Sequence, residues 1–131
     1  MNLNEINEFL CTQFPYLANR PIVETADSAG IRVRLPFHER SLRPGGTIAG
    51  PSIMLLADTV AYAALLSDGD EAVQAVTSNL NINFLRRPEP GDLVGISRLR
   101  KKGRRLSVIN VTIEDHLGRV VADASVTYAM A

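Results

Sequence analysis

The sequence predicts a single α+β domain in which one long helix is covered by an antiparallel sheet. The chain has 131 residues, which suits one domain with one core. Residues 51–66 read as a long apolar helix, and residues 75–130 read as four strands joined by short loops. Because short loops between successive strands favour antiparallel pairing, we expect a helix followed by an antiparallel meander.

The other elements follow from the same patterns. Apolar residues at helical spacing predict a short amphipathic helix over residues 3–11, and alternation over residues 22–37 predicts one or two strands. A loop rich in Arg, Pro and Gly separates these from the long helix. We treat residues 1–131 as one domain, in which residues 1–20 form an N-terminal helix and linker. The four later strands are expected at residues 75–85, 92–101, 106–114 and 120–130.

Composition and charge narrow the class of protein. The formal net charge is +0 and the pI is about 6.7, so no global field favours nucleic acid or an anionic membrane. The single cysteine, Cys11, excludes an intrachain disulfide and suits a reducing compartment. The N-terminal segment has no basic start, and the apolar run over residues 53–66 is shorter than the roughly 20 residues of a membrane span. We expect a cytoplasmic protein that binds neither nucleic acid nor membrane.

The long helix is apolar almost all the way round, which is typical of a helix that is buried on most sides. Gly50 is a candidate cap, and Pro51 suits the first turn because its missing N–H would be unpaired there. One flat sheet face cannot cover every side of such a helix. We therefore expect either a sheet that wraps around it or a second subunit that covers the rest.

Asp58 lies in the middle of this apolar helix, where an ionised carboxylate is unfavourable unless it is paired or solvated. It has two interpretations. It could point to water or accept a hydrogen bond from Thr59, Tyr62 or a partner subunit. It could instead lie in a cleft and act as a general base or as a nucleophile.

Gly50, at the start of the helix, is the second candidate for chemistry. The first N–H groups of a helix have no internal acceptor, and the positive end of the helix dipole lies there. A backbone N–H in this place can stabilise a developing oxyanion. The alternative is that the glycine-rich stretch over residues 45–50 is a tight loop that needs glycine for its backbone angles.

Three segments together resemble the hotdog-fold acyl-CoA thioesterases, in the branch of the phenylacetate-pathway and 4-hydroxybenzoyl-CoA thioesterases. They are GGTIAGPSIMLLADTVAYAALL, AVTSNLNINFLRRPEPGDL and GRRLSVINVTIEDHLGRVVADASVTYAM. The resemblance covers roughly residues 30–131. It implies a long central helix wrapped by a curved antiparallel sheet. It also implies a homodimer or a dimer-of-dimers tetramer, with active sites at the subunit interface.

The resemblance also implies roles for individual residues. The family's helix aspartate, a nucleophile or general base, matches Asp58. The backbone N–H that polarises the thioester carbonyl matches Gly50, and the hydroxyl that positions the attacking water matches Thr77. In relatives, the glycine and the aspartate that serve one substrate come from different subunits. The substrate is an acyl-CoA, and no cofactor or metal is implied.

The sequence departs from the family at two positions. The branch usually has His-Gly-Gly ahead of the helix, where this chain has Ala49-Gly50-Pro51. The usual asparagine falls near Arg43. These losses leave open slow hydrolysis, a different use of Arg43 or Ser52, or no hydrolysis. The alternatives are therefore a non-catalytic acyl-CoA-binding hotdog protein and an acyl-CoA hydratase or dehydratase.

Further residues are candidates for binding the substrate. Basic residues near predicted turns could hold the phosphates of coenzyme A or could simply be solvated. Met54, Leu55 and Tyr62 are candidates for the acyl pocket. Asn79, Asn81 and Asn83 alternate along one predicted strand, with Thr77 in the same row, and we expect that row at a subunit interface. The complete set of candidate substrate-binding residues is Arg43, Ala49, Pro51, Ser52, Arg86, Arg87, Arg104 and Arg105.

Two histidines complete the candidates. His38 and His116 fall in predicted loops, and neither is part of a metal-ligand spacing. His38 is retained as a weak alternative catalyst, and His116 is interpreted as a turn residue.

Overall fold

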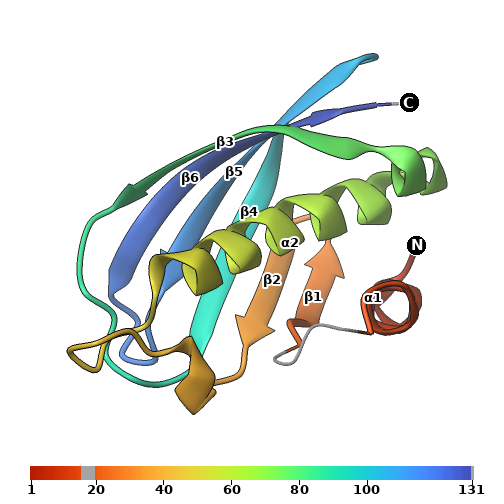
Figure 1. Ribbon diagram of the computed structural model, residues 1–131. Coiled ribbons are helices and arrows are strands. Elements are labelled where there is room, and N and C mark those ends of the chain that lie inside the picture. The colour runs from red at the N-terminus through yellow and green to blue at the C-terminus, as the bar shows by residue number, and fades with distance from the viewer. Residues whose placement is uncertain (16–19, 131) are drawn as a thin grey trace.

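A computed structural model describes residues 1–15 and 20–130, and for residues 99–101 the backbone only. The long helix α2 lies inside the curve of a six-stranded antiparallel sheet (Figure 1). This confirms the α+β class and the hotdog arrangement. In chain order the elements are α1 (Leu3–Gln13), β1 (Ile22–Asp27), β2 (Gly30–Leu35), the 3-10 helix η1 (Glu39–Ser41), α2 (Gly50–Asp68), the 3-10 helix η2 (Asp70–Gln74), β3 (Val76–Phe84), β4 (Leu93–Lys102), β5 (Leu106–Glu114) and β6 (Val120–Ala129).

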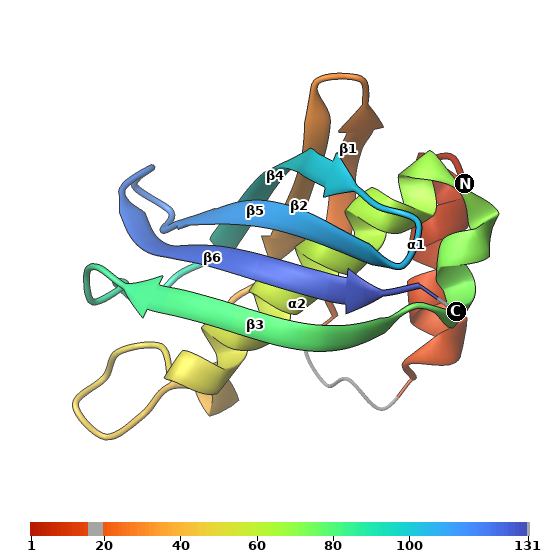
Figure 2. The same cartoon turned by 90° about the horizontal axis from the view of Figure 1, so that it is seen from above.

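The strand order is β1-β2-β4-β5-β6-β3, so the expected meander is only partly correct (Figure 2). β4, β5 and β6 pair in succession, but β3 pairs with β6 and forms an edge of the sheet. The connection from β3 to β4, residues 85–92, is longer than a hairpin turn and carries the chain past β6 and β5. Loop lengths alone therefore did not reveal this crossover.

Helix α2 supplies the centre of the core. It is apolar on nearly all sides, and Leu56 and Val60 are fully buried against the sheet. Gly95 on β4 allows this close approach, because a Cβ there would lie 2.5 Å from Val60 Cγ2. By length and composition the full 19-residue helix would also suffice for a membrane span, contrary to what the shorter apolar run suggested. Its position inside the sheet accounts for its apolar character as a core helix.

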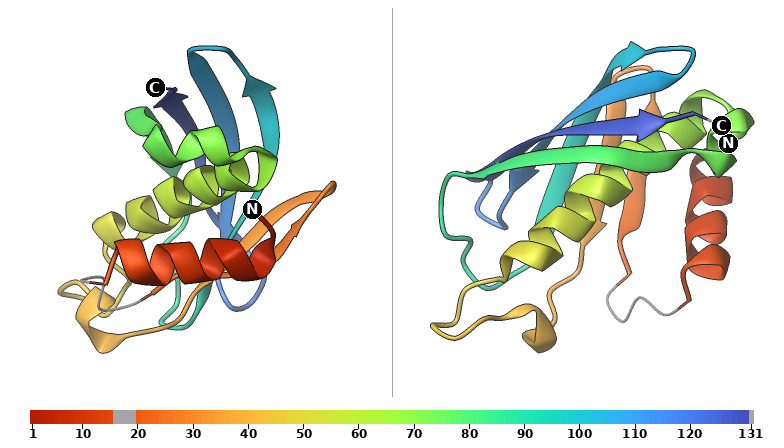
Figure 3. Two further views of the ribbon diagram at one scale, coloured as in Figure 1. Left: turned by 90° about the vertical axis from the view of Figure 1, so that its right-hand side faces the viewer. Right: turned by 45° about the horizontal axis from the view of Figure 1, so that its top comes forward.

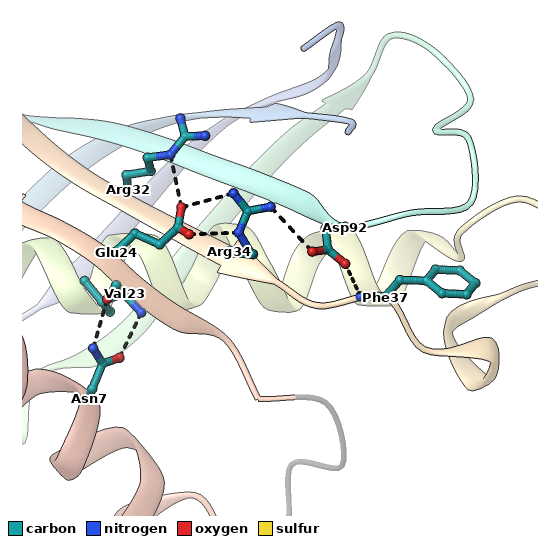
Figure 4. A network of polar contacts seen from close by, with 7 residues as sticks. All are labelled: Asn7, Val23, Glu24, Arg32, Arg34, Phe37 and Asp92. Carbon is teal, nitrogen blue, oxygen red and sulfur yellow. Dashed lines mark hydrogen bonds and ion pairs between the residues drawn. The ribbon is translucent and has the colours of Figure 1, made fainter. Parts of the chain in front are cut away.

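Helix α1 covers the β1 edge of the sheet (Figure 3). It begins with a capping box, in which Asn2 accepts from the Glu5 backbone and Glu5 accepts from the Asn2 backbone. Its Ile6 is fully buried. Asn7 joins the helix to the edge strand, since its side chain accepts from Val23 N at 2.8 Å and donates to Val23 O at 2.9 Å (Figure 4).

The outer face of β1 and β2 carries an ion-pair network (Figure 4). Glu24 pairs with Arg32 at 3.1 Å and with Arg34 at 2.8 Å, and Arg34 reaches Asp92 at 3.5 Å. Asp92 also accepts a hydrogen bond from Phe37 N at 2.7 Å. The hydrogen bond from Arg34 is the main reason that the pKa of Glu24 lies below its ordinary value. The network ties β1 and β2 to the start of β4.

The β3 edge, unlike the β1 edge, is not covered by a described helix. Most side chains of β3 are exposed, and the strand VTSNLNINF contains no charged residue and no proline. Natural proteins usually protect such an edge with charges, proline or a covering element. The outer edge of β3 is therefore a surface suited to pairing with another strand.

Candidate active site

Asp58 is half-buried on α2 and receives two hydroxyl groups at one oxygen. Thr77 Oγ1 and Tyr128 Oη each donate to Asp58 Oδ1 over 2.8 Å. The two residues of the same helix that were expected to donate to Asp58, Thr59 and Tyr62, donate to other groups. Thr59 donates to the Leu55 carbonyl, and Tyr62 donates to the Val73 carbonyl. Asp58 is therefore held by residues from the edge strand β3 and from its neighbour β6.

Thr77 reaches Asp58 because β3 changes register. Thr77 pairs with Tyr128 and Asn79 pairs with Thr127, so Ser78 is the extra residue of a bulge. Strict alternation would place Thr77 in one row with Asn79, Asn81 and Asn83, as the sequence suggested. The expectation that Thr77 shares a face with these asparagines is wrong. The bulge turns Thr77 toward the helix, while the asparagines lie on the outer face.

Tyr128 is the functional candidate that the sequence did not reveal. Its ring stacks on Tyr62 with centroids 5.7 Å apart and an interplanar angle of 10°. Burial, together with the nearby Asp58 charge, raises the pKa of Tyr128 above its ordinary value. The available signal was a phenol in the last strand at the same parity as the buried Val126. Only the fold shows that its hydroxyl meets Asp58.

Asp58 lies at the wall of a largely apolar pocket of about 630 Å³ between α1 and α2. This volume is within the range of small-molecule sites. Tyr62 and Leu55 line it as expected, whereas Met54 is not among its described lining residues and is 40% exposed. The N-terminal helix contributes an unexpected wall through Leu10 and Phe14. Arg20 and Cys11 also line the pocket, and the Arg20 guanidinium contacts the exposed Cys11 thiol.

Gly50 lies at a second pocket, at the beginning of α2. The helix begins one residue earlier than expected, because Ala49 is the N-cap and Gly50 is the first helical residue. The pocket has a volume of about 380 Å³ and includes Arg43, Arg86 and Arg87. Among the described residues, none of these three arginines forms an ion pair. The structure thus brings four candidate residues from distant parts of the sequence to one place.

Three of the remaining candidates flank Gly50 but are not among the described lining residues of its pocket. Ala49 donates its N–H to the Ser41 carbonyl, Ser52 donates its N–H to the Ala49 carbonyl, and Pro51 is exposed. Arg104 and Arg105 are exposed on the β4–β5 turn, which lies at the opposite end of α2 from Gly50 (Figure 1).

Among the described side chains, Lys102, His38 and His116 do not line the Asp58 pocket. Lys102 pairs with Asp68 and Glu71 near the end of α2, and the side chain of Lys101 lies outside the described part of the structure. His38 caps η1 by accepting from Arg40 N, and His116 is exposed. The described residues include no group of three or more His, Cys, Asp or Glu side chains that could hold a metal ion.

One protomer does not bring Gly50 and Asp58 to the same carbonyl group. The two residues are separated along α2 by roughly 12 Å, at 1.5 Å per residue. They also line different pockets. A reacting atom must lie about 3 Å from both its nucleophile and its oxyanion donor. Within a single chain, Gly50 and Asp58 therefore cannot act on the same carbonyl group.

With its long helix inside a curved antiparallel sheet and an aspartate beside an apolar pocket, the chain has the arrangement of a hotdog thioesterase. It belongs to the thioesterase superfamily, whose family model matches residues 45–122. Thioester hydrolysis is the general activity that this membership supports.

Solved structures agree with this assignment. The chain is 36% identical to a Silicibacter sp. TM1040 protein provisionally called a thioesterase, with TM-score 0.89 and coverage of 100% of this chain and 92% of that one. It is 25% identical to a Streptococcus mutans UA159 protein solved with acetyl CoA bound, with TM-score 0.78 and coverage of 88% and 91%. The E. coli PaaI protein of the phenylacetic acid degradation operon shares the fold, with 20% identity, TM-score 0.80 and coverage of 99% and 96%.

Proposed function

We propose that this protein hydrolyses an acyl-CoA thioester in a site formed by two copies of the chain. The observation that carries the proposal is the Asp58 carboxylate, held by Thr77 and Tyr128 at the wall of an apolar pocket. A carboxylate fixed in this way beside space for an apolar group is suited to act as a general base or as a nucleophile.

The second copy would pair through β3. This edge strand is uncharged and uncovered, so its free backbone groups can bind another strand. Antiparallel pairing about a two-fold axis would place the Phe84 end of one β3 beside the Val76 end of the other. Gly50 lies beside Phe84, and Thr77 follows Val76. The pairing would therefore bring Gly50 of one copy toward Asp58 of the other.

The two pockets would hold different parts of the substrate. Its acyl group would occupy the 630 Å³ pocket, whose polar side chains Asn7, Thr59 and Tyr62 already bond to protein backbone. The largely apolar lining favours an apolar acyl group. The phosphates of coenzyme A would bind Arg43, Arg86 and Arg87 beside Gly50, because guanidinium groups suit phosphate geometry.

Arg104 and Arg105 lie too far from Gly50 in one protomer to join this phosphate site. The same antiparallel pairing would bring the turn that carries them toward the Gly50 end of the second copy. They remain a proposed extension of the phosphate site on that basis.

The reaction consumes one water and yields a free acid and the coenzyme A thiol. As a general base, Asp58 would take a proton from the water as the water oxygen attacks the acyl carbon. The Gly50 N–H would stabilise the resulting oxyanion. As the oxyanion collapses the carbon–sulfur bond would break, and the proton held by Asp58 would pass to the departing thiolate. As a nucleophile, Asp58 would attack the acyl carbon and expel the coenzyme A thiolate, which takes a proton from water. A second water would then hydrolyse the acyl-enzyme anhydride to the free acid and restore the Asp58 carboxylate.

The test is a thiol-release assay over a panel of acyl-CoA substrates with wild type, Asp58→Asn and the control Asp123→Asn. Asp123 is an exposed aspartate on the outer face of β6. We expect hydrolysis to fall at least about 100-fold in Asp58→Asn and to persist in the control. Full activity in Asp58→Asn would overturn the role of Asp58. Binding of coenzyme A without turnover of any panel member would favour a non-catalytic acyl-CoA-binding protein.

A further inference from the structure

Both hydroxyl groups at Asp58 donate to the same carboxylate oxygen. Thr77 and Tyr128 each lie 2.8 Å from Oδ1, and within the described residues no donor is found at Oδ2. The terminal torsion of an aspartate is soft, so an unrestrained carboxylate would rotate between orientations. We propose that Tyr128 is a positioning residue that, together with Thr77, fixes this rotation and leaves Oδ2 as the oxygen that reacts.

Tyr128 is itself held firmly enough to have this effect. It is 4% exposed, and its ring stacks on Tyr62. Tyr62 is anchored in turn by its hydroxyl, which donates to the Val73 carbonyl over 2.9 Å. The Tyr128 hydroxyl also lies 3.3 Å from the backbone carbonyl of Asp58. The phenol therefore contacts both the carboxylate and the helix backbone that carries it.

The Tyr128 hydroxyl stays protonated and can therefore always donate to Asp58. Its pKa is raised by burial and then by the Asp58 charge, so the hydroxyl keeps its proton across the physiological pH range. Thr77 does not titrate there either. The orientation of Asp58 should therefore not depend on a protonation switch in its neighbours.

This inference rests on the proposed thioesterase function and adds a division of labour between the two oxygens. Oδ1 receives the two hydroxyl groups and sets the plane of the carboxylate. Oδ2 takes the proton from water or attacks the acyl carbon. Since the Tyr128 hydroxyl donates to Asp58, the proposed reacting group, its loss should lower kcat much more than it changes KM.

The first variant is Tyr128→Phe, which keeps the stacked ring and removes only the hydroxyl. We expect kcat to fall about 10- to 100-fold, as for loss of a hydrogen bond to a charged group, with KM changed less than about 3-fold. The matched control is Thr127→Val, which removes a hydroxyl from the opposite face of the same strand and should leave kcat unchanged. An unchanged kcat in Tyr128→Phe, or a loss confined to KM, would overturn the inference.

A second measurement separates positioning from mere stability. Fluorinated tyrosine introduced at position 128 changes the donor strength of the phenol with little change of shape. We expect kcat to change with fluorination while the melting temperature stays constant. A constant kcat would refute the positioning role, and this readout remains available if Tyr128→Phe does not fold.

The Asp58→Asn result keeps this inference distinguishable from the proposed function. If wild type turns over no panel member, the proposed function fails. If Asp58→Asn retains full hydrolysis, the role of Asp58 fails, and this inference fails with it. If Asp58→Asn is inactive and Tyr128→Phe retains its kcat, the thioesterase proposal stands and the role of Tyr128 alone is wrong.

Discussion

The two edge strands of the sheet, β1 and β3, differ in how they are protected against pairing with another strand. β1 is short, carries Glu24 and Asp27, and is covered by α1 through the paired hydrogen bonds of Asn7 with Val23. β3 is longer, has no charged residue, and has no described helix along its outer edge. Since uncovered edges normally carry protection against pairing, this contrast supports the proposed pairing through β3, whereas β1 is covered by its own chain.

Asp58 lies beside the uncovered edge strand β3. Its two hydroxyl partners come from β3 and from β6, the strand next to it. The Gly50 backbone lies beside Phe84, at the other end of β3. Asp58 and Gly50 therefore lie toward opposite ends of the uncovered edge strand.

The largest expected effect comes from a charge on the uncovered edge strand β3. In Asn81→Lys the exposed centre of β3 gains a lysine, which should block pairing and yield a monomer. Activity should fall about 100- to 1000-fold, as for loss of an oxyanion donor, because the second copy's Gly50 is removed. Molar mass by light scattering and thiol release measure the two effects.

The matched control places the same charge on the covered edge strand β1. Thr25→Lys changes an exposed residue of β1 and should alter neither molar mass nor activity. A fully active Asn81→Lys monomer would contradict the two-copy site. An Asn81→Lys protein with the mass of wild type would contradict pairing through β3.

A smaller effect is expected at the junction that closes the β1 edge. Asn7→Ala leaves Val23 N and Val23 O without their partner and should lower the free energy of unfolding by about 1–3 kcal/mol. Chemical denaturation measures this change. Asn4→Ala, an exposed position on the same helix, should change stability by less than about 0.5 kcal/mol. Equal effects of the two variants would mean that α1 is not fastened through Asn7.

The smallest effect is expected for the ion pairs of Glu24. Because the hydrogen bond from Arg34 lowers the pKa of Glu24, its stabilisation is present at neutral pH and is lost as pH falls through the folded-state pKa. Glu24→Gln should therefore destabilise the fold by less than about 1 kcal/mol at pH 7, and this difference should shrink toward pH 3. Unfolding curves at several pH values measure it, with Glu8→Gln as an exposed control. A difference that grows in acid would contradict the assigned cause.

The sequence predicted the elements well because their patterns are local. The apolar helix, the alternating strands and the glycine-rich loop each depend on neighbouring residues. The β3–β6 pairing was not predictable in this way, since it joins segments far apart in the chain. The N-cap shifted from Gly50 to Ala49 for a smaller reason, because helix ends are defined only to within a residue or two.

The candidate site was predictable in part. Asp58 became a candidate because a carboxylate in an apolar helix is energetically unusual. Thr77 became a candidate through the family resemblance, although its side chain was placed on the wrong face because alternation along a strand does not reveal a bulge. Tyr128 was missed because its partner is defined by tertiary packing and not by any spacing along the chain.

The most direct test of the two-copy site mixes two inactive variants. Asp58→Asn removes the carboxylate, and Gly50→Pro removes the backbone N–H at a helix position that tolerates proline. After subunit exchange, a mixed dimer would contain one site with both groups intact and one site with neither. We therefore predict recovery to about a quarter of wild-type activity in an equimolar mixture of symmetric dimers. The control mixes Asp58→Asn with the Asp58→Asn/Gly50→Pro double variant and should recover nothing. No recovery in the first mixture, with subunit exchange demonstrated, would show that each site is built within one chain.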